Sequence, residues 1–298
     1  MSLNIAPSRG HEEPFKGIFL VCLAIFLFSS HDALSKYLSA IYPIVMVVWV
    51  RYMVHTLLLA GFFLPRQGLG VLRSRRPWLQ LTRALSLIGC SLFFTAGLRH
   101  IPLAEATAVN FLAPLLVLAL SVPLLGERVG RNQWLAVLGG LVGVLIIIRP
   151  GSALFTPAIL LPLGSALCFG FYQILTRLLA AHDSPATSNF LTGIINTLIM
   201  SALVPFFWQA PHNLKEAALM LALGSCGMGG HMLLTQAYRH ASPGLLAPFG
   251  YGQIVFAGLL GFLVFGHMPD AWAVLGIGII CLCGLLVALG QRSAVDAG

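Results

Sequence analysis

The chain has 298 residues, of which 58% are hydrophobic and only 9% are charged. Its mean hydropathy is +0.91, whereas soluble domains carry charge on about a quarter of their residues. This composition excludes a soluble enzyme or binding module and predicts an integral membrane protein. The formal charge of +8 is then explained by loop residues that orient the chain in the bilayer, and we expect no nucleic-acid partner.

Ten apolar segments approach the length of about 20 residues that a helix needs to cross a bilayer. Residues 1–16 precede the first segment without a signal-cleavage pattern, so we expect that segment to be retained, with 291–298 as a short tail. The fold class is therefore predicted as an all-α membrane bundle with spans at 17–38, 43–64, 78–98, 103–123, 133–149, 156–178, 187–208, 216–238, 243–264 and 271–290.

The second half of the chain echoes the first half in order. A shift of 140 positions places Arg99-His100 on Arg239-His240. We therefore divide the chain into two repeats of five spans, 17–149 and 150–290. Because five is an odd number, the two repeats must cross the bilayer in opposite directions. Inverted repeats are typical of alternating-access carriers, whose substrate site lies at the repeat interface near the bilayer midplane.

The basic residues are distributed unevenly between the loops. Most loop Lys and Arg residues fall on the side of the two termini, and only Arg99, Arg149 and Lys215 fall on the other side. Cytoplasmic loops carry an excess of Lys and Arg. We therefore expect both termini to be cytoplasmic.

The fourth and ninth spans, which correspond under the repeat, each contain a proline. Pro114 frees the backbone carbonyl of Asn110, and Pro248 frees that of Gly244, because proline has no N–H to donate. A freed carbonyl at membrane depth must be buried in protein or line a wet cavity. One interpretation is that Pro114 and Pro248 allow helix bending or gating, and the other is that each makes an ordinary packing kink.

Ionisable residues lie inside the first two spans. Such residues are costly at bilayer depth and by default mark functional sites. Asp32 lies one helical turn from Lys36 and at a depth comparable with Arg51, so an ion pair with either residue is feasible. A structural ion pair, an outer gate or substrate-contacting pair, and a proton-coupling carboxylate remain open as alternatives.

Neutral polar and aromatic residues recur at repeat-related depths. Tyr172-Gln173 corresponds to His31-Asp32, and Phe111 corresponds to Tyr251. Such groups suit a small zwitterionic or amphipathic solute, although each could equally make an interhelical hydrogen bond. The candidate substrate-binding residues are His31, Asp32, Arg51, Asn110, Phe111, Tyr172, Gln173, Tyr251 and Gln253.

One further arginine, Arg83, lies in the third span close to Trp78. We interpret it as an interfacial residue whose long side chain snorkels to the headgroups. It is therefore given no part in the substrate site.

No catalytic or metal-binding pattern is found in the sequence. There is no H-E-x-x-H motif, no pair of intramembrane aspartates and no Ser-His arrangement at catalytic spacing. The cysteines fall inside apolar spans, and the Cys281-x-Cys283 pair has the wrong spacing for a metal site. We expect no enzymatic activity, no cofactor and no metal.

One stretch carries a family resemblance. The run from Gly97 to Ala106, followed by Pro114, Gly126-Glu127-Arg128 and Gly139, resembles the repeat unit of the EamA branch of the drug/metabolite transporter superfamily. The resemblance covers about 15–290 as two tandem units. The second unit departs from it, because Gly266-His267 replaces the Gly-Glu of the family and the seventh span has no counterpart of Arg51.

The resemblance implies a ten-helix carrier in the bacterial inner membrane, closest in appearance to amino-acid exporters of the YddG type. The expected function is export of amino acids or similar small metabolites by alternating access. An exporter of drugs or lipid-like compounds is the main alternative, and an intramembrane enzyme or a passive channel is a remote one. The expected partners are a small-molecule substrate and the lipid bilayer. The substrate, the energy coupling and the oligomeric state remain open, with a monomer as the working expectation.

Overall fold

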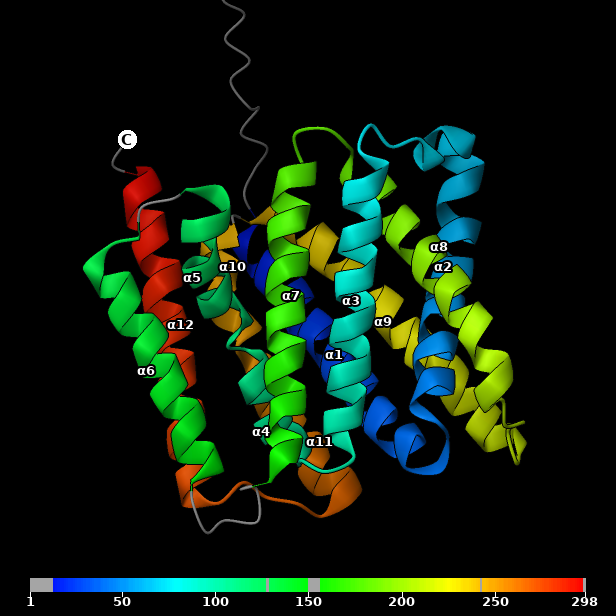
Figure 1. Cartoon of the computed structure of the whole chain (residues 1–298). Helices are drawn as coiled ribbons and strands as arrows, with labels where there is room; N and C mark the ends of the chain where they lie inside the picture. Colours follow the sequence, from blue (N-terminus) through cyan, green and yellow to red (C-terminus); the bar gives the residue numbers. More distant parts are fainter. Residues whose placement is uncertain (1–12, 127–128, 150–155, 242, 297–298) are drawn as a thin grey trace, which may run out of the picture.

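The computed structural model describes residues 13–126, 129–149, 156–241 and 243–296. Glu127 and Arg128 of the family motif lie outside these ranges. All regular elements in the described residues are helical (Figure 1). In the first repeat they are α1 (Pro14–Ile41), α2 (Ile44–Gln67), the short 3-10 helix η1 (Gly68–Leu72), α3 (Pro77–Leu98), α4 (Leu103–Asn110), α5 (Ala113–Leu125) and α6 (Arg131–Ile148).

The second repeat follows the same order of elements. They are η2 (Pro157–Ile159), α7 (Leu160–Leu179), α8 (Pro185–Leu203), η3 (Val204–Phe207), α9 (Leu214–His240), α10 (Pro243–Gly250), α11 (Gly252–Phe265) and α12 (Ala271–Asp296). Within the described residues, nine segments are long and apolar enough to span a membrane, and Ala271–Val287 forms a shorter apolar helix. The predicted all-α bundle of ten spans is confirmed.

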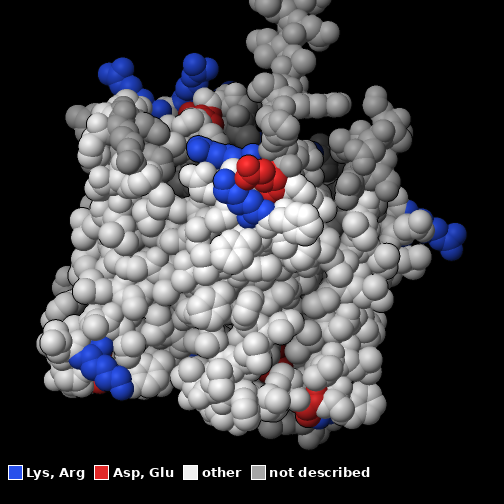
Figure 2. Space-filling model, turned by 180° about the vertical axis from the view of Figure 1, so that it is seen from behind, with Lys and Arg blue, Asp and Glu red and all other residues white. Residues whose placement is uncertain are grey.

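The two repeats run in opposite directions. Helix α1 begins, and α12 ends, at the upper end of the bundle in Figure 1, whereas α7 begins at the lower end. We call the end that holds Pro14 and Asp296, which is the upper end in Figure 1, the basal face. The opposite end, which holds Ile41, is the apical face. Figure 2 shows Lys and Arg side chains near both faces, with a broad belt free of charge between them. Large apolar side chains such as Leu145 and Leu263 are exposed, as is expected of side chains that contact lipid.

The helix pairs follow the repeat. Helix α1 packs against α9 and α3 against α7, while α6 packs on α12, α2 on α8 and α4 on α11. Exchanging the two repeats converts the α1–α9 pair into the α7–α3 pair and leaves the α6–α12 and α2–α8 pairs unchanged, while the α4–α11 contact joins the equivalent fourth and ninth spans. A twofold axis between the repeats requires this arrangement.

The fourth and ninth spans are interrupted at equivalent places. Helix α4 ends at Asn110 and α5 begins at Ala113, directly before Pro114. Helix α10 ends at Gly250 and α11 begins at Gly252, shortly after Pro248. A proline removes one backbone hydrogen bond and crowds the preceding turn, which accounts for the break directly before Pro114, whereas Pro248 lies inside α10 and the break follows it. A role of these breaks in gating stays a prediction.

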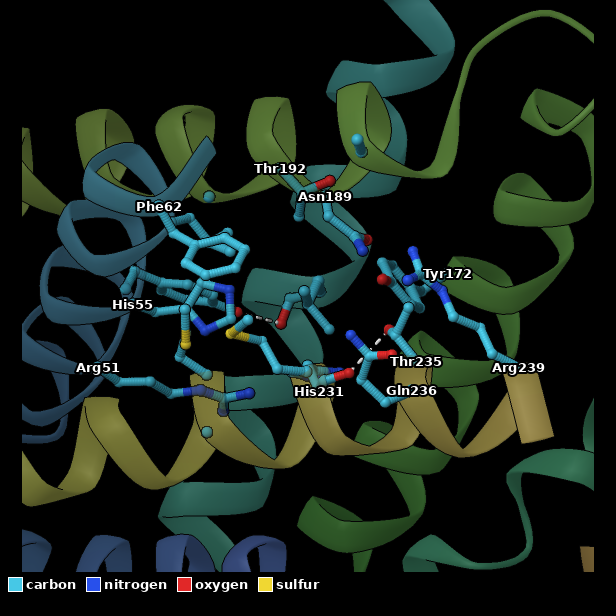
Figure 3. A pocket seen from close by; sticks show the side chains of 18 residues that line it. Arg51, His55, Phe62, Tyr172, Asn189, Thr192, His231, Thr235, Gln236 and Arg239 are labelled. Carbon is cyan, nitrogen blue, oxygen red and sulfur yellow. Dashed lines mark hydrogen bonds between the residues drawn. The ribbon is translucent and has the colours of Figure 1, made fainter. Parts of the chain in front are cut away.

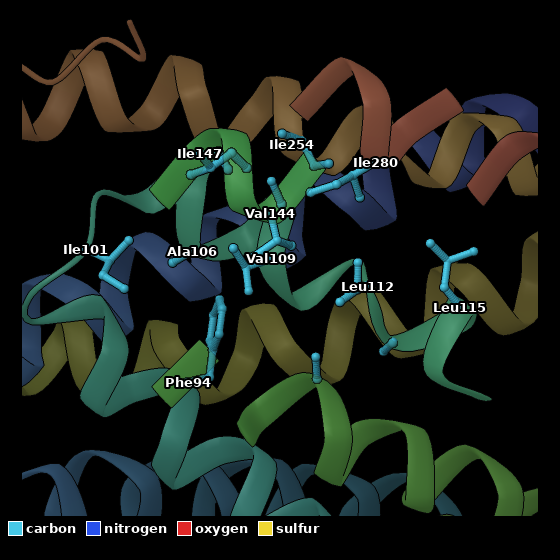
Figure 4. Close-up of a cluster of buried hydrophobic side chains, with 14 of the residues drawn as sticks. Phe94, Ile101, Ala106, Val109, Leu112, Leu115, Val144, Ile147, Ile254 and Ile280 are labelled. Atoms are coloured by element: carbon cyan, nitrogen blue, oxygen red, sulfur yellow. The ribbon is translucent and has the colours of Figure 1, made fainter. Parts of the chain in front are cut away.

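The main hydrophobic core fills one half of the bundle. It joins α3, α4, α5, α6, α11 and α12 through side chains such as Val109, Leu112 and Ile280 (Figure 4). Helices α6 and α12 approach closely here, because a Cβ atom added at Gly276 would lie 2.5 Å from the carbonyl oxygen of Gly143. Small residues at such a crossing let two membrane helices pack backbone to backbone. The remaining half of the bundle contains a cavity.

Candidate substrate cavity

A cavity of about 270 Å³ lies between α2, α3, α7, α8 and α9 (Figure 3). Its lining residues Phe62, Ala186 and Arg239 lie at the basal ends of their helices, and Arg51 lies deepest along α2. Roughly 16 Å of helix separates Phe62 from Arg51 at about 1.5 Å per residue. The cavity therefore runs from the basal face to about mid-membrane and ends at Arg51.

Helix α3 holds the side chain of Arg51 in place at the blind end. Arg51 Nη1 donates to Ser91 Oγ at 3.1 Å, and its guanidinium lies 5.3 Å from the ring centroid of Tyr52. The Tyr52 hydroxyl lies 2.6 Å from Ser91 Oγ and donates to the carbonyl oxygen of Leu87 at 3.0 Å. Arg51 makes no other hydrogen bond within the described residues, so most of its donors are available to a solute.

Two histidines flank the inner part of the cavity. The rings of His55 and His231 lie 5.8 Å apart at 86°, and His231 also meets the ring of Phe28 edge-on at 4.9 Å. Gly227, one turn before His231, brings no side chain into the space. The ring nitrogens can each donate or accept a hydrogen bond, depending on the tautomer.

A fully buried arginine lies directly behind the cavity wall. Arg83 has 1% of its surface exposed, and its guanidinium lies 4.4 Å from the ring centroid of Tyr172. It donates to five neutral oxygens on α7 and α8, namely Thr176 Oγ1 (2.6 Å), Ser188 O (2.8 Å), Thr192 Oγ1 (2.5 Å), Tyr172 OH (2.7 Å) and Asn189 Oδ1 (3.3 Å).

This placement corrects the expectation of a snorkelling Arg83. The side chain points into the bundle because hydroxyl and carbonyl acceptors from two helices surround it there. Tyr172, Asn189 and Thr192, which accept its hydrogen bonds, all line the cavity. Arg83 therefore positions three polar groups of the wall. Within the described residues no carboxylate forms a salt bridge with it.

The structure places only Arg51 and Tyr172, of the predicted substrate-binding residues, in the cavity lining. His31 is buried, and its Nδ1 lies 2.9 Å from the carbonyl oxygen of Leu223. Asp32 accepts a hydrogen bond from Gln253 Nε2 at 3.1 Å. These contacts lie where α1 meets α9 and α11.

An ion pair of Asp32 with Lys36 or Arg51 is not formed in the part of the chain that the structure describes, so that expectation is wrong for this conformation. Lys36 donates instead to the carbonyl oxygen of Ile101 at 2.8 Å and to that of Leu98. The last carbonyls of a helix have no intrahelical partner, which makes the end of α3 a strong acceptor for the ammonium group.

The other predicted residues lie along the interface between the repeats. Asn110 Oδ1 accepts from Ser165 Oγ at 2.8 Å, and the rings of Phe111 and Tyr251 lie 5.2 Å apart. Gln173, the residue after Tyr172 on α7, is half-buried. The described lining of the cavity includes none of these residues.

Comparison with known proteins decides the family. The EamA-like transporter family matches residues 15–149 and 156–289, one match for each repeat. The chain belongs to the EamA-like transporter family.

Relatives of this EamA-like transporter carry different solutes by name. The S-adenosylmethionine uptake transporter of Rickettsia prowazekii is 26% identical over 94% of this chain and 95% of its own. The pseudopaline exporter CntI of Pseudomonas aeruginosa is 31% identical over 87% and 91%, and the riboflavin transporter of Vibrio cholerae is 28% identical over 90% and 91%. A crystal structure with 20% identity covers 95% of this chain and 99% of its own at a TM-score of 0.64, a likeness in fold alone.

Polar ties close the apical face of this EamA-like transporter. Arg99 donates to the carbonyl oxygens of Ser39 at 2.5 Å and Tyr42 at 2.7 Å, which joins the end of α3 to the α1–α2 turn. The Tyr42 hydroxyl in turn contacts His212 and Glu216 at the start of α9. At the basal end, Phe62 and Arg239 line the cavity. In the described part of the chain, the cavity therefore extends to the basal ends of α2, α8 and α9 and is separated from the apical face by these hydrogen bonds.

One acidic residue ties two basal loops together beside the cavity mouth. Asp183 accepts hydrogen bonds from the Arg75 backbone N–H and from Gln80 Nε2, both at 2.8 Å, and from the Ser74 hydroxyl. Burial alone would raise the pKa of Asp183, but these three hydrogen bonds outweigh it and hold the pKa below its usual value. The tie joins the α2–α3 connection to the α7–α8 connection.

Several cavity residues of the EamA-like transporter were absent from the predicted site. They include His55, Asn189, His231, Gln236 and Arg239. Their signal in the sequence is spacing, because Gly227, His231, Thr235 and Arg239 recur every four residues and so share one face of α9. The predicted eighth span ends at residue 238, whereas α9 continues through Arg239 to His240.

Proposed function

We propose that this chain exports small metabolites, amino acids among them, across the bacterial inner membrane by alternating access. The observation that carries the proposal is the cavity, which is reached from the basal face, ends at Arg51 near mid-membrane and is separated from the apical face by polar ties. Such a cavity can load a solute from one side only. The relatives named as transporters support a carrier function.

The distribution of loop charges supports a cytoplasmic basal face. Arg73, Arg75 and Arg76 lie in the basal α2–α3 connection, while the apical loops hold few basic residues. By the positive-inside rule, both ends of the chain then lie in the cytoplasm. The described conformation would accept a solute from the cytoplasm, as an exporter must.

The inverted repeats supply a route to the opposite conformation. Rocking one repeat against the other would open the ties at Arg99 and Tyr42 and bring the basal ends of α2, α8 and α9 together, as in carriers with inverted repeats. Pro114 and Pro248 would permit the bending. In this scheme Arg51 and Tyr172 contact the solute once it has entered the cavity. The other predicted residues contact it during the crossing, namely His31, Asp32, Asn110, Phe111, Gln173, Tyr251 and Gln253.

Counterflow in proteoliposomes tests the proposal. Vesicles preloaded with an unlabelled amino acid should accumulate the labelled one, and a pH gradient across the membrane would reveal proton coupling. We expect Arg51→Ala to impair counterflow while the protein stays folded and monodisperse. Arg73→Ala, an exposed basal arginine outside the cavity, is the matched control. Absence of counterflow across a broad panel of amino acids and small metabolites would refute the proposal.

A second candidate, export of amphipathic drug-like compounds, is favoured by the apolar part of the cavity. Leu59, Phe62, Met228 and Met232 line it, and methionine side chains adapt to varied apolar shapes. Resistance of cells that express the protein to a panel of amphipathic drugs, without counterflow of amino acids, would favour this candidate.

A further inference from the structure

The charged side chains that line the cavity in the described residues are all positive. Its described lining contains two arginines, Arg51 and Arg239, and neither Asp nor Glu. Figure 3 shows these two side chains entering from opposite ends, Arg51 from α2 and Arg239 from the end of α9. Arg83, behind the wall, adds a third positive charge without a carboxylate partner in the described residues. A cationic solute would therefore be repelled along the whole length of the cavity.

The guanidinium donors of the two lining arginines are largely unused. Arg51 makes a single hydrogen bond, to Ser91, and Arg239 makes none to any residue that the structure describes. Arg83 differs, because its donors are all directed at protein oxygens. A charge removed from water is unfavourable unless it is paired. Arg51 is half-buried at the blind end, so its unused donors favour an anionic partner, whereas Arg239 is exposed at the mouth, where water can satisfy its donors.

The nearby acidic residue of α1 does not fill this role. Asp32 is buried, does not line the cavity and accepts a hydrogen bond from Gln253 on α11. It forms no salt bridge with Arg51 in the described part of the chain. Asp32 is near enough for its charge to interact with that of Arg51, but a carboxylate in direct hydrogen-bonding contact with Arg51 would have to enter with the solute.

We propose that the cavity selects solutes that carry a carboxylate, which Arg51 binds at the blind end and Arg239 attracts at the mouth. This inference rests on the proposed transport function and names its substrate class. Arginine presents two parallel N–H donors that match the two oxygens of a carboxylate. Because the lining offers neutral oxygens but no acid to an ammonium group, removing the carboxylate should cost more affinity than removing the amino group.

Matched solutes and matched variants test the inference on the purified, full-length protein. The panel consists of L-phenylalanine, L-phenylalaninamide, phenethylamine and 3-phenylpropionate, with the corresponding leucine and glutamine series and with phenyl phosphate. Binding is measured as a rise in the thermal-unfolding midpoint, and transport as counterflow. We expect the carboxylates of at least one series to bind at least tenfold more tightly than its amide and amine.

The variants assign that preference to individual residues. Arg51→Gln should remove at least tenfold of the carboxylate affinity and abolish the preference over the amide, whereas Arg51→Lys should retain part of it. Arg239→Gln should weaken binding mainly at low salt, because attraction at the mouth is screened by ions. Arg73→Gln should bind as the unmodified protein does. If Arg51→Gln does not fold, Arg51→Lys and the carboxylate–amide comparison in the unmodified protein decide the matter.

Three results would overturn the inference: equal binding of amides or amines, a preference for carboxylates that survives Arg51→Gln, or binding of phenyl phosphate with none of the carboxylates. Its failure is distinguishable from failure of the transport proposal. Counterflow of the amides at the rate of the carboxylates would support the transport function and refute the carboxylate selectivity. Carboxylate binding without counterflow of any solute would support the carboxylate site and refute the transport function.

Discussion

The rings of Phe111 and Tyr251 contact each other at the breaks of the fourth and ninth spans, with centroids 5.2 Å apart and planes at 47°. The two residues occupy equivalent positions in the two repeats. Residues that are related by a twofold axis and also touch must lie close to that axis. The interruptions beside Pro114 and Pro248 therefore meet at the centre of the repeat interface, where relative motion of the repeats would act on both.

The first prediction concerns the close packing of the Tyr251 side chain against Gly284 of α12. A Cβ atom at Gly284 would lie 1.7 Å from the Tyr251 hydroxyl oxygen, so Gly284→Ala must displace the ring. Overpacking of this kind costs about 1–3 kcal/mol, and we expect a lower thermal-unfolding midpoint. Gly278→Ala in the same helix meets no atom within 4 Å and should leave the midpoint unchanged. Equal midpoints for the two variants would show that Tyr251 is not held there.

Removing the hydroxyl offers a further check on this contact. Combining Gly284→Ala with Tyr251→Phe should recover part of the lost stability, because the closest atom of the clash is gone. The ring carbon that bears the hydroxyl would still lie 2.4 Å from the new Cβ, so recovery should be incomplete. A double variant no more stable than Gly284→Ala would contradict the assignment of the clash to the hydroxyl.

The second prediction concerns Arg83 as a positioning residue. Arg83→Gln would leave Tyr172 and Asn189 without their common donor and should lower stability by about 1–3 kcal/mol, the usual cost of unpaired buried polar groups. Transport should show a weaker apparent affinity for the solute, because these two groups line the cavity. Arg83→Lys should restore the charge but only part of the affinity, because an ammonium group cannot reach five acceptors.

Arg73→Gln, in an exposed basal loop, serves as the control for Arg83. A purely structural role would lower the midpoint of the Arg83 variants while the folded fraction kept its normal affinity. Normal affinity in folded Arg83→Gln protein would therefore exclude the positioning role.

The sequence sufficed to predict the ten spans, the two repeats and the family. The spans follow from long apolar runs, and the repeats follow from residues of the first half that recur in the same order in the second half. Both depend on the local sequence alone. The helix break before Pro114 is equally local, because it follows from a missing backbone donor. Such properties can be predicted without knowing which helices touch.

The site was harder to predict because it depends on which helices become neighbours. Arg83 has no acid within its own helix, and its acceptors come from α7 and α8, about a hundred residues later in the chain. Spacing makes a pairing of Asp32 with Lys36 or Arg51 feasible, but in the structure Asp32 accepts a hydrogen bond from Gln253 of the other repeat. A pairing rule within one or two helices could not anticipate these contacts, whereas the four-residue spacing along α9 could have indicated its cavity face.

The third prediction is a dependence of stability on acid pH at the apical face. Arg149 donates two hydrogen bonds to Asp270, at 3.2 and 2.5 Å, and together with the Ala273 backbone N–H this lowers the pKa of Asp270 to about 2. Because the folded pKa lies below the usual value of 3.8, the tie stabilises the protein above about pH 4. Its contribution should disappear as the pH falls from 4 to 2.

Asp270→Asn tests this dependence. The variant should lose less stability than the unmodified protein over this pH interval, when the midpoint is followed in a detergent that is insensitive to acid. Lys16→Gln, which breaks the exposed pair of Lys16 with Glu13 at the basal face, is the control. If the midpoints of Asp270→Asn and of the unmodified protein fell equally between pH 4 and pH 2, the proposed contribution of the Arg149–Asp270 pair would be contradicted.

The fourth prediction concerns Asn196, which is completely buried on α8, with neither its amide nitrogen nor its amide oxygen hydrogen-bonded within the described residues. It follows Asn189 and Thr192 at helical spacing, so it continues the cavity face of α8 toward the apical side. A buried polar group without a partner costs about 1–3 kcal/mol. Asn196→Leu, which has a similar size, should therefore raise the thermal midpoint.

We expect the same variant to transport more slowly, because the amide would find its partner, a solute or a neighbouring helix, when the cavity shifts toward the apical face. Ser225→Ala removes an exposed hydroxyl that bonds only the Leu221 carbonyl of its own helix and should change neither property. Counterflow by Asn196→Leu at the unmodified rate, together with a higher midpoint, would mean that Asn196 plays no part in the transport cycle. A lower midpoint would mean that its amide already has a partner in this conformation.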